Sequence, residues 1–406
     1  MSHSVKGNNG SFTYSYVMAV VGILIVWNPL QRWILQIDGA GISPFLLVLS
    51  ALFLIRRQLR KNLLKKHVII YFILMIYMFA NAYVKHSYFS AYTKGNPEWL
   101  MFYNLFISPM VMLLVMYLCS RNVDRSLKFF LFAILCYCVL ALFFAGSEEH
   151  EGRLGGGINS NEIALTGSIG FCVALLHVVR KQLSYIALFF FAAIPAATVF
   201  ASGSRMGFGI IFIAFTLTTL TIVRKGKKMA VLGKLLGICV LGFIVFYALS
   251  NTLLGERLAH TSEDTEGMML ATGTILDLFG DRGLQYYFSW PYFVDNLATG
   301  IGFQKWRELF INDLCFHSEW LVQYCEGGLI AFALYLVFFF GTIHSIKNTK
   351  LYKNEEIRRT RNTLLSVMCA IAFANFVLWT YNSVPIFVIY ALCNSYPIYL
   401  KIERHA

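Results

Sequence analysis

The chain has 406 residues, of which 58% are hydrophobic and only 14% are charged. This composition excludes the soluble globular classes and indicates a polytopic membrane protein. The net charge of +13 does not indicate nucleic acid as the main partner, because no basic stripe is interleaved with a polar fold that could bind a duplex. The nine cysteines form no CxxC pair and no metal-ligand spacing, so neither a disulfide framework nor a metal site is expected.

Apolar runs long enough to cross about 30 Å of hydrocarbon recur along the whole chain. They predict an all-α, polytopic transmembrane helical bundle of about twelve spans, in a single integral membrane domain over residues 1–406. The predicted spans begin near residues 12, 41, 68, 100, 128, 161, 184, 207, 235, 318, 363 and 384.

Basic residues are distributed unevenly between the two sets of loops. With a cytoplasmic amino terminus, the cytoplasmic segments carry a net charge of +21 and the opposite segments carry −8. The most basic segments are 56–66, 224–234 and 347–361. Because cytoplasmic loops are enriched in Lys and Arg, the positive charge reflects topology, and both termini are expected in the cytoplasm.

One loop is much longer than the others. Residues 251–316 are expected to form an extracytoplasmic loop between the ninth and tenth spans, acidic at first and rich in aromatic residues from 286 to 293. Aromatic rings favour the membrane interface. Part of this loop is therefore expected to form interfacial helices that lie on the outer leaflet.

The first polar cluster opens the sixth predicted span. It runs from Arg153 to Glu162 and contains three glycines together with Asn159 and Asn161. Backbone N–H groups of a glycine-rich turn and a helix amino terminus suit an anionic oxygen. The alternative is a flexible loop with an ordinary asparagine cap.

The second polar cluster, Ser202 to Arg205, lies in the short turn before the eighth predicted span. A guanidinium beside two hydroxyls, one of them that of Ser204, presents a planar donor fork suited to phosphate. The alternative is an arginine that extends its charged end to the membrane interface.

The third polar cluster closes the long loop. It contains Arg282, then a Gly-Ile-Gly-Phe step, then His317 to Glu319, with Glu326 following. A histidine at a water-facing surface can accept a proton from a hydroxyl, although a lone histidine more often has no chemical role. Glu326 lies about 13 Å below His317 in a regular helix. It is therefore either a buried partner or a sign that the helix projects above the membrane before Gly327.

Taken in order, these clusters resemble the O-antigen ligase and O-antigen polymerase superfamily of bacterial envelope glycosyltransferases. The family pattern combines an arginine before an Asn-rich turn, a Ser-Arg turn, and a loop arginine followed by a Gly-x-Gly-aromatic step. It ends on a His-Asn/Ser-x-x-Leu helix start and a Glu-x-Gly-Leu step. The matching residues are Arg153 with Asn159 to Glu162, Ser202 to Arg205, Arg282 with Gly300 to Phe303, and His317 to Leu321 with Glu326 to Leu329. Two departures are the missing proline between Asn159 and Asn161 and Ser318 in place of the commoner Asn.

The resemblance implies a protein of the bacterial inner membrane that acts at its periplasmic face. A glycan on undecaprenyl diphosphate would be transferred to the hydroxyl of a second sugar, with inversion and without a metal or cofactor. Arg205 and Arg282, helped by Arg153, would stabilise the departing diphosphate, and His317 would be the base. Asn159, Asn161, Ser204, Glu319 and Glu326 would support the site.

Two versions of this reaction stay open, because the motifs are common to both. A ligase would use lipid A core as the acceptor, whereas a polymerase would use a second lipid-linked repeat unit. The alternative from another class is a flippase or transporter of lipid-linked oligosaccharides. That alternative is disfavoured because, Glu326 apart, no charged residue falls near the middle of a predicted span.

Overall fold

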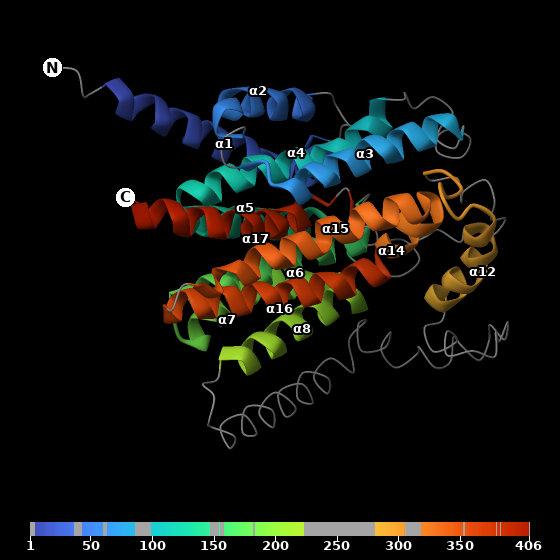
Figure 1. Ribbon diagram of the computed structural model, residues 1–406. Helices are drawn as coiled ribbons and strands as arrows, with labels where there is room; N and C mark the ends of the chain where they lie inside the picture. The colour runs from blue at the N-terminus through green and yellow to red at the C-terminus, as the bar shows by residue number, and fades with distance from the viewer. Residues whose placement is uncertain are drawn as a thin grey trace.

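The protein is a bundle of helices, most of which run side by side (Figure 1). The computed structural model describes residues 5–35, 43–59, 63–85, 99–146, 154, 158–181, 183–222, 281–303, 305, 318–351, 354–378, 380–381 and 383–405. Of these residues, 88% are helical and none forms a strand, which confirms the predicted all-α class.

The helices have the following bounds. In the first half of the chain they are α1 (Val5–Pro29), the π-helical turn η1 (Leu30–Ile34), α2 (Ser43–Gln58), α3 (Lys66–Val84), α4 (Trp99–Arg121), α5 (Val123–Phe144), α6 (Ser160–Arg180), α7 (Tyr185–Ala201) and α8 (Arg205–Ile222). In the second half they are α12 (Asp281–Asp295), α14 (Glu319–Leu321), the π-helical turn η4 (Val322–Glu326), α15 (Gly328–Lys347), the 3-10 turn η5 (Asn348–Leu351), α16 (Glu355–Val377) and α17 (Val384–His405).

Six of the described helices, α3, α5, α6, α15, α16 and α17, are long and apolar enough to cross a membrane. Shorter apolar stretches lie within α1, α4, α7 and α8. The protein is therefore a multi-pass membrane protein by the length and composition of its helices. The predicted span near residue 235 falls outside the described residues, and the total of twelve spans stays a prediction.

Helix α6 lies at the centre of the bundle, and 94% of its apolar window is buried. It packs against α5, α7, α8 and α16. Glycines allow this close approach: a Cβ at Gly167 would lie 2.8 Å from the Pro195 carbonyl oxygen, and one at Gly170 would lie 2.7 Å from an Ile134 methyl group. Small residues at such contacts are typical of helix packing within membranes.

Both termini lie at one end of the bundle (Figure 1). We call this the basic end, because α2, α4, α6 and α15 finish there with arginine or lysine in their last turns. Buried Arg180 of α6 contacts Asp124 of α5 at 2.7 Å and Glu356 of α16 at 3.3 Å, which ties three helices together. The opposite end, where α6, α8, α14 and α17 begin, is the polar end.

The predicted orientation places the basic end in the cytoplasm. A cysteine replacing Trp290 of α12, whose side chain is 59% exposed, should react with a membrane-impermeant maleimide in intact cells. A cysteine replacing exposed Lys347 at the basic end should react only after the cells are permeabilised. Labelling of the Lys347→Cys variant in intact cells would overturn the orientation.

Candidate functional site

Two of the three polar clusters meet at the polar end. Asn159 caps α6, since its side chain accepts a hydrogen bond from the Asn161 amide at 2.8 Å. The Ser204 hydroxyl donates to Asn161 Oδ1 at 3.0 Å, and the Leu154 amide donates to the Ala201 carbonyl at 3.4 Å. Residues of the first two polar clusters therefore join the starts of α6 and α8.

The turn between α7 and α8 places Arg205 at the surface. Gly203 has a φ of 62°, in the left-handed region that favours glycine, and this allows α8 to begin two residues later. Ser202 and Ser204 are buried, and the Ser204 carbonyl and hydroxyl accept hydrogen bonds from the first turn of α8. Arg205 is the first residue of α8, and its side chain is exposed.

The Gly-Ile-Gly-Phe step and the Glu-x-Gly-Leu step form a single unit. The Ile301 and Gly302 amides donate to the Cys325 and Glu326 carbonyls, both at 2.9 Å. Gly300 and Gly328 both have positive φ, 69° and 70°. A Cβ at Gly300 would lie 2.3 Å from the Glu326 carbonyl oxygen, so any larger residue there would separate the two backbones. The glycines are required because two chain segments touch main chain to main chain.

Side chains from other helices hold this unit in place. Asn81 of α3 donates to the Thr299 carbonyl at 2.7 Å and to the Glu326 carbonyl at 3.2 Å. Tyr77 of the same helix donates to the Gly327 carbonyl at 3.0 Å. Buried Phe303 packs edge to face on Tyr381, with ring centroids 5.2 Å apart. The end of the long loop is therefore anchored to α3 and to the turn before α17.

The carboxylate of Glu319 is fully buried and holds the turn between α16 and α17. Its Oε2 accepts hydrogen bonds from the Thr380 and Tyr381 amides at 2.6 and 3.0 Å, and its Oε1 accepts one from the Gln323 amide group at 2.7 Å. Burial raises the pKa of Glu319 above its ordinary value, although these hydrogen bonds act in the opposite direction. Its position fits a structural support of the site.

Ser318 fixes the start of α14 on α16. Its hydroxyl donates to the Asn375 carbonyl at 3.1 Å and accepts from the Leu321 amide at 3.4 Å, as an N-cap does. The Glu319 amide also donates to the Leu378 carbonyl at 3.1 Å. The backbone that directly follows His317 is therefore held by three bonds.

The helix from residue 318 to residue 347 is not regular, contrary to the expectation of a span that starts near 318. The three-residue helix α14 passes into the π-helical turn η4, and Gly327 separates η4 from α15. Glu326 is buried within η4, before the candidate span Gly328–Lys347. Its burial fits a buried partner, and its place before the candidate span fits a helix that projects above the membrane, so both sequence interpretations stay open.

The long loop contains one described helix, α12, which packs against η4. Ser289 is fully buried, and its hydroxyl lies 3.1 Å from the Tyr324 hydroxyl. Tyr287, Trp290 and Val294 are exposed. Exposed aromatic residues on one side and a polar contact on the other fit a helix at the membrane interface. Arg282 lies in the first turn of α12.

Two of the predicted site residues, Arg153 and His317, lie outside the described residues, as do Gly155 to Gly157. For Arg282 the backbone alone is described. Asn159, Asn161, Ser204 and Arg205 lie together at the starts of α6 and α8. The Glu326 carbonyl contacts the Gly-Ile-Gly-Phe step directly, whereas Glu319 contacts Tyr381, on which Phe303 of that step packs. Helix α16 packs against α6, α8 and α14 and so connects the two groups.

A buried polar network that the sequence did not predict lies beside this site. The Asn375 amide group donates to the Tyr335 hydroxyl at 2.7 Å, and the Thr380 hydroxyl donates to Asn375 Oδ1 at 2.8 Å. An asparagine within an apolar run is the signal that could have found it, because a buried amide requires partners.

Within the described part of the chain, no group of three or more His, Cys, Asp or Glu residues could hold a metal ion. The chain matches no protein-family model and no curated protein.

The hydrogen bonds to Glu319 give a stability prediction. Glu319→Ala should lower the free energy of unfolding by about 3 kcal/mol, because the buried Thr380 and Tyr381 amides lose their acceptor. Glu319→Gln should lower it less, since one amide oxygen can still accept from both. Unfolding in detergent would measure this, with exposed Glu403→Ala as the control. Equal stability of Glu319→Ala and the control would contradict the role.

Proposed function

We propose that the protein is a membrane glycosyltransferase of the O-antigen ligase or polymerase type. It would transfer a glycan from undecaprenyl diphosphate to a sugar hydroxyl at the periplasmic face, in the assembly of lipopolysaccharide or another surface polysaccharide. One observation carries the proposal. The described parts of the polar motifs, which lie far apart in the sequence, gather at one end of an apolar bundle and are connected through α16.

The residue types at this end suit the reaction. As the anomeric carbon leaves the diphosphate, negative charge grows on the phosphate oxygens, and a guanidinium fork stabilises it. Arg205 is exposed at the start of α8, where the helix amino terminus adds partial positive charge. Arg282, in the first turn of α12, and Arg153, before α6, would complete the diphosphate site.

The acceptor hydroxyl must lose its proton as its oxygen attacks the anomeric carbon. His317 would take that proton, while the bond from carbon to diphosphate breaks and the carbon is inverted. The hydrogen bonds of Ser318 and Glu319 to α16 and to the following turn hold the adjacent backbone. A fixed backbone supports the accurate placement that general base catalysis needs.

The transporter alternative has less support. In the six candidate spans, the Asp, Glu, Lys and Arg residues lie within the first two or the last two turns. An ion-coupled transporter usually needs an ionisable group deeper in the membrane.

Purified protein, mixed with a repeat unit on undecaprenyl diphosphate and an acceptor, tests the proposal. Release of undecaprenyl diphosphate together with a lengthened glycan would support it. Lack of transfer to either acceptor would contradict it, provided that the protein folds.

A deletion strain separates the two versions and the alternative. Lipid-linked polymer that accumulates while the core stays bare indicates a ligase, and a core capped with single units indicates a polymerase. Lipid-linked units that accumulate in the cytoplasmic leaflet would indicate a flippase instead.

A further inference from the structure

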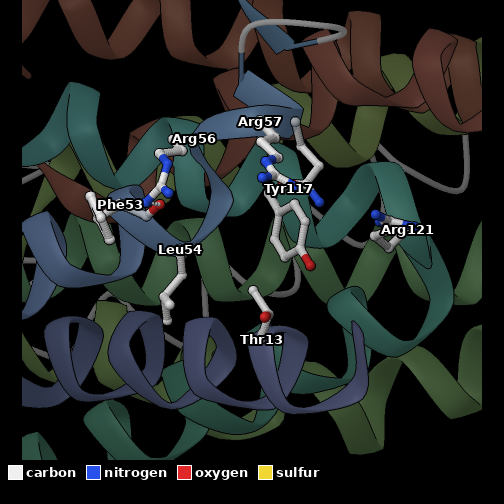
Figure 2. A pocket seen from close by; sticks show the side chains of 8 residues that line it. Thr13, Phe53, Leu54, Arg56, Arg57, Tyr117 and Arg121 are labelled. Carbon is white, nitrogen blue, oxygen red and sulfur yellow. Dashed lines mark hydrogen bonds between the residues drawn. The ribbon is translucent and has the colours of Figure 1, made fainter. Parts of the chain in front are cut away.

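A pocket of about 370 Å³ lies between α1, α2 and α4 (Figure 2). Its arginines come from the last turns of α2 and α4, at the basic end. Its volume falls within the range of roughly 300–1,000 Å³ that small-molecule sites occupy. It is lined by Thr13, Phe53, Leu54, Arg56, Arg57, Gln58, Tyr117 and Arg121.

Three of the eight lining residues are arginines, and none is acidic. Arg56 and Arg57 end α2, whereas Arg121 ends α4, so the fold brings them together from distant parts of the sequence. Asp124, the acidic residue nearest to Arg121 along the chain, contacts Arg180 and Lys181 instead, at 2.7 and 2.6 Å. Like charges in one pocket repel one another, and a bound anion relieves that repulsion.

Aromatic rings support two of these guanidinium groups. The guanidinium carbon of Arg56 lies 3.9 Å from the centre of the Phe53 ring, and that of Arg121 lies 5.7 Å from the centre of the Tyr117 ring. An Arg56 N–H also donates to the Phe53 carbonyl at 3.5 Å. The contact with the ring restricts each arginine, and its remaining N–H groups point away from the ring face. Figure 2 shows Arg57 and Arg121 on either side of Tyr117, with Thr13 nearby, and Arg56 beside Phe53. The Tyr117 hydroxyl can add a hydrogen bond to an anion.

An exposed apolar surface continues from the pocket along α2. Leu46, Leu49 and Phe53 are exposed and follow a helical spacing of three and four residues, and exposed Leu54 adjoins them. A free phosphate ion would not use this surface. An acyl chain would, and basic residues at the cytoplasmic ends of membrane helices are the usual partners of anionic headgroups.

From this combination we infer that the pocket binds the phosphate of an anionic phospholipid from the cytoplasmic leaflet. Arg57 and Arg121 hold the phosphate oxygens, and the acyl chains lie along the exposed face of α2. This site is separate from the proposed transferase site, so the two proposals stand or fall independently.

Lipid retention by the full-length protein tests the inference. The protein is purified in detergent with phosphatidylglycerol or with phosphatidylcholine, and bound lipid is counted by native mass spectrometry. The pocket variant is Arg57→Gln with Arg121→Gln. Its matched control, Lys347→Gln with Lys401→Gln, removes the same charge from exposed positions at the same end.

We expect the wild type and the control to retain phosphatidylglycerol in preference to phosphatidylcholine. The pocket variant should bind phosphatidylglycerol on the order of tenfold to a hundredfold more weakly, since charge-assisted contacts are lost. If it does not fold, Arg57→Lys with Arg121→Lys replaces it and should bind severalfold more weakly, because ammonium groups cannot form the fork.

Four outcomes would overturn the inference. Equal loss in the control variant would mean that only diffuse charge matters. Equal retention of phosphatidylcholine would mean that the pocket does not select an anionic lipid by the net charge of its headgroup. Unchanged binding by a folded pocket variant, or by its Lys replacement, would remove the site. If inorganic phosphate alone stabilised the wild type to the same degree as phosphatidylglycerol and also displaced phosphatidylglycerol, the ligand would be a free phosphate ion.

Discussion

Replacing Arg205 with Ala is expected to abolish glycan transfer, and Arg282→Ala is expected to do the same. Loss of a single group that stabilises transition-state charge lowers the rate by roughly 10²- to 10³-fold, and these two arginines would share the charge of one diphosphate. The loss should fall mainly on kcat, because the charge on the leaving group grows as the glycosidic bond breaks. A purified transfer assay at saturating donor would measure it.

Lysine variants separate fork geometry from charge. Arg205→Lys and Arg282→Lys keep a positive charge but cannot contact two phosphate oxygens with a planar fork, so only partial rescue is expected. The control is Arg32→Ala, an exposed arginine in the π-helical turn that follows α1. Wild-type turnover by both Lys variants would leave the two arginines with only a diffuse electrostatic role.

Much of the fold was predictable because apolar runs in a membrane protein leave few alternatives to helices. Eleven of the twelve predicted span starts lie within a described helix or within a few residues of its beginning. The remaining start, near residue 235, lies outside the described residues. The helix that begins near residue 318 differs from the prediction in one detail, because the π-helical turn η4 interrupts it. A composition window cannot detect the π-helical turn η4, nor the close backbone contact of Gly300 with Gly328 that lies beside it.

The contacts between residues close in the sequence were predictable in the candidate site, whereas the contacts between distant residues were not. The Asn159 cap and the tight Ser202 to Arg205 turn follow from residue types whose preferences act within a few positions. The role of Glu319 does not, since its partners Thr380 and Tyr381 lie about sixty residues away. In the sequence, Glu319 was a candidate only because it lies two residues after His317. The burial of its carboxylate is explained by the packing of α14 on α16.

His317→Ala is expected to slow transfer by roughly 10²- to 10⁴-fold, the usual range for a lost general base. Donor binding should survive, because the proposed diphosphate site consists of arginines and not of His317. Wild-type activity should fall as the pH drops through the pKa of this histidine, near 6.5 in an unperturbed side chain, since the imidazolium cannot accept a proton. His344→Ala, which replaces an exposed histidine in the last turn of α15 at the basic end, is the control and should transfer normally.

The Gln variant shows whether His317 moves a proton or only positions the acceptor. Glutamine can hydrogen-bond a hydroxyl but cannot take its proton at neutral pH, so His317→Gln should be nearly as slow as His317→Ala and should lose the pH dependence. If His317→Gln transferred glycan at a normal rate while His317→Ala lost donor binding, His317 would be a positioning residue. The base would then have to be sought at Glu319 or Glu326. Both are buried. The Glu319 carboxylate already accepts hydrogen bonds from three N–H donors, those of Gln323, Thr380 and Tyr381, which makes it the poorer candidate of the two.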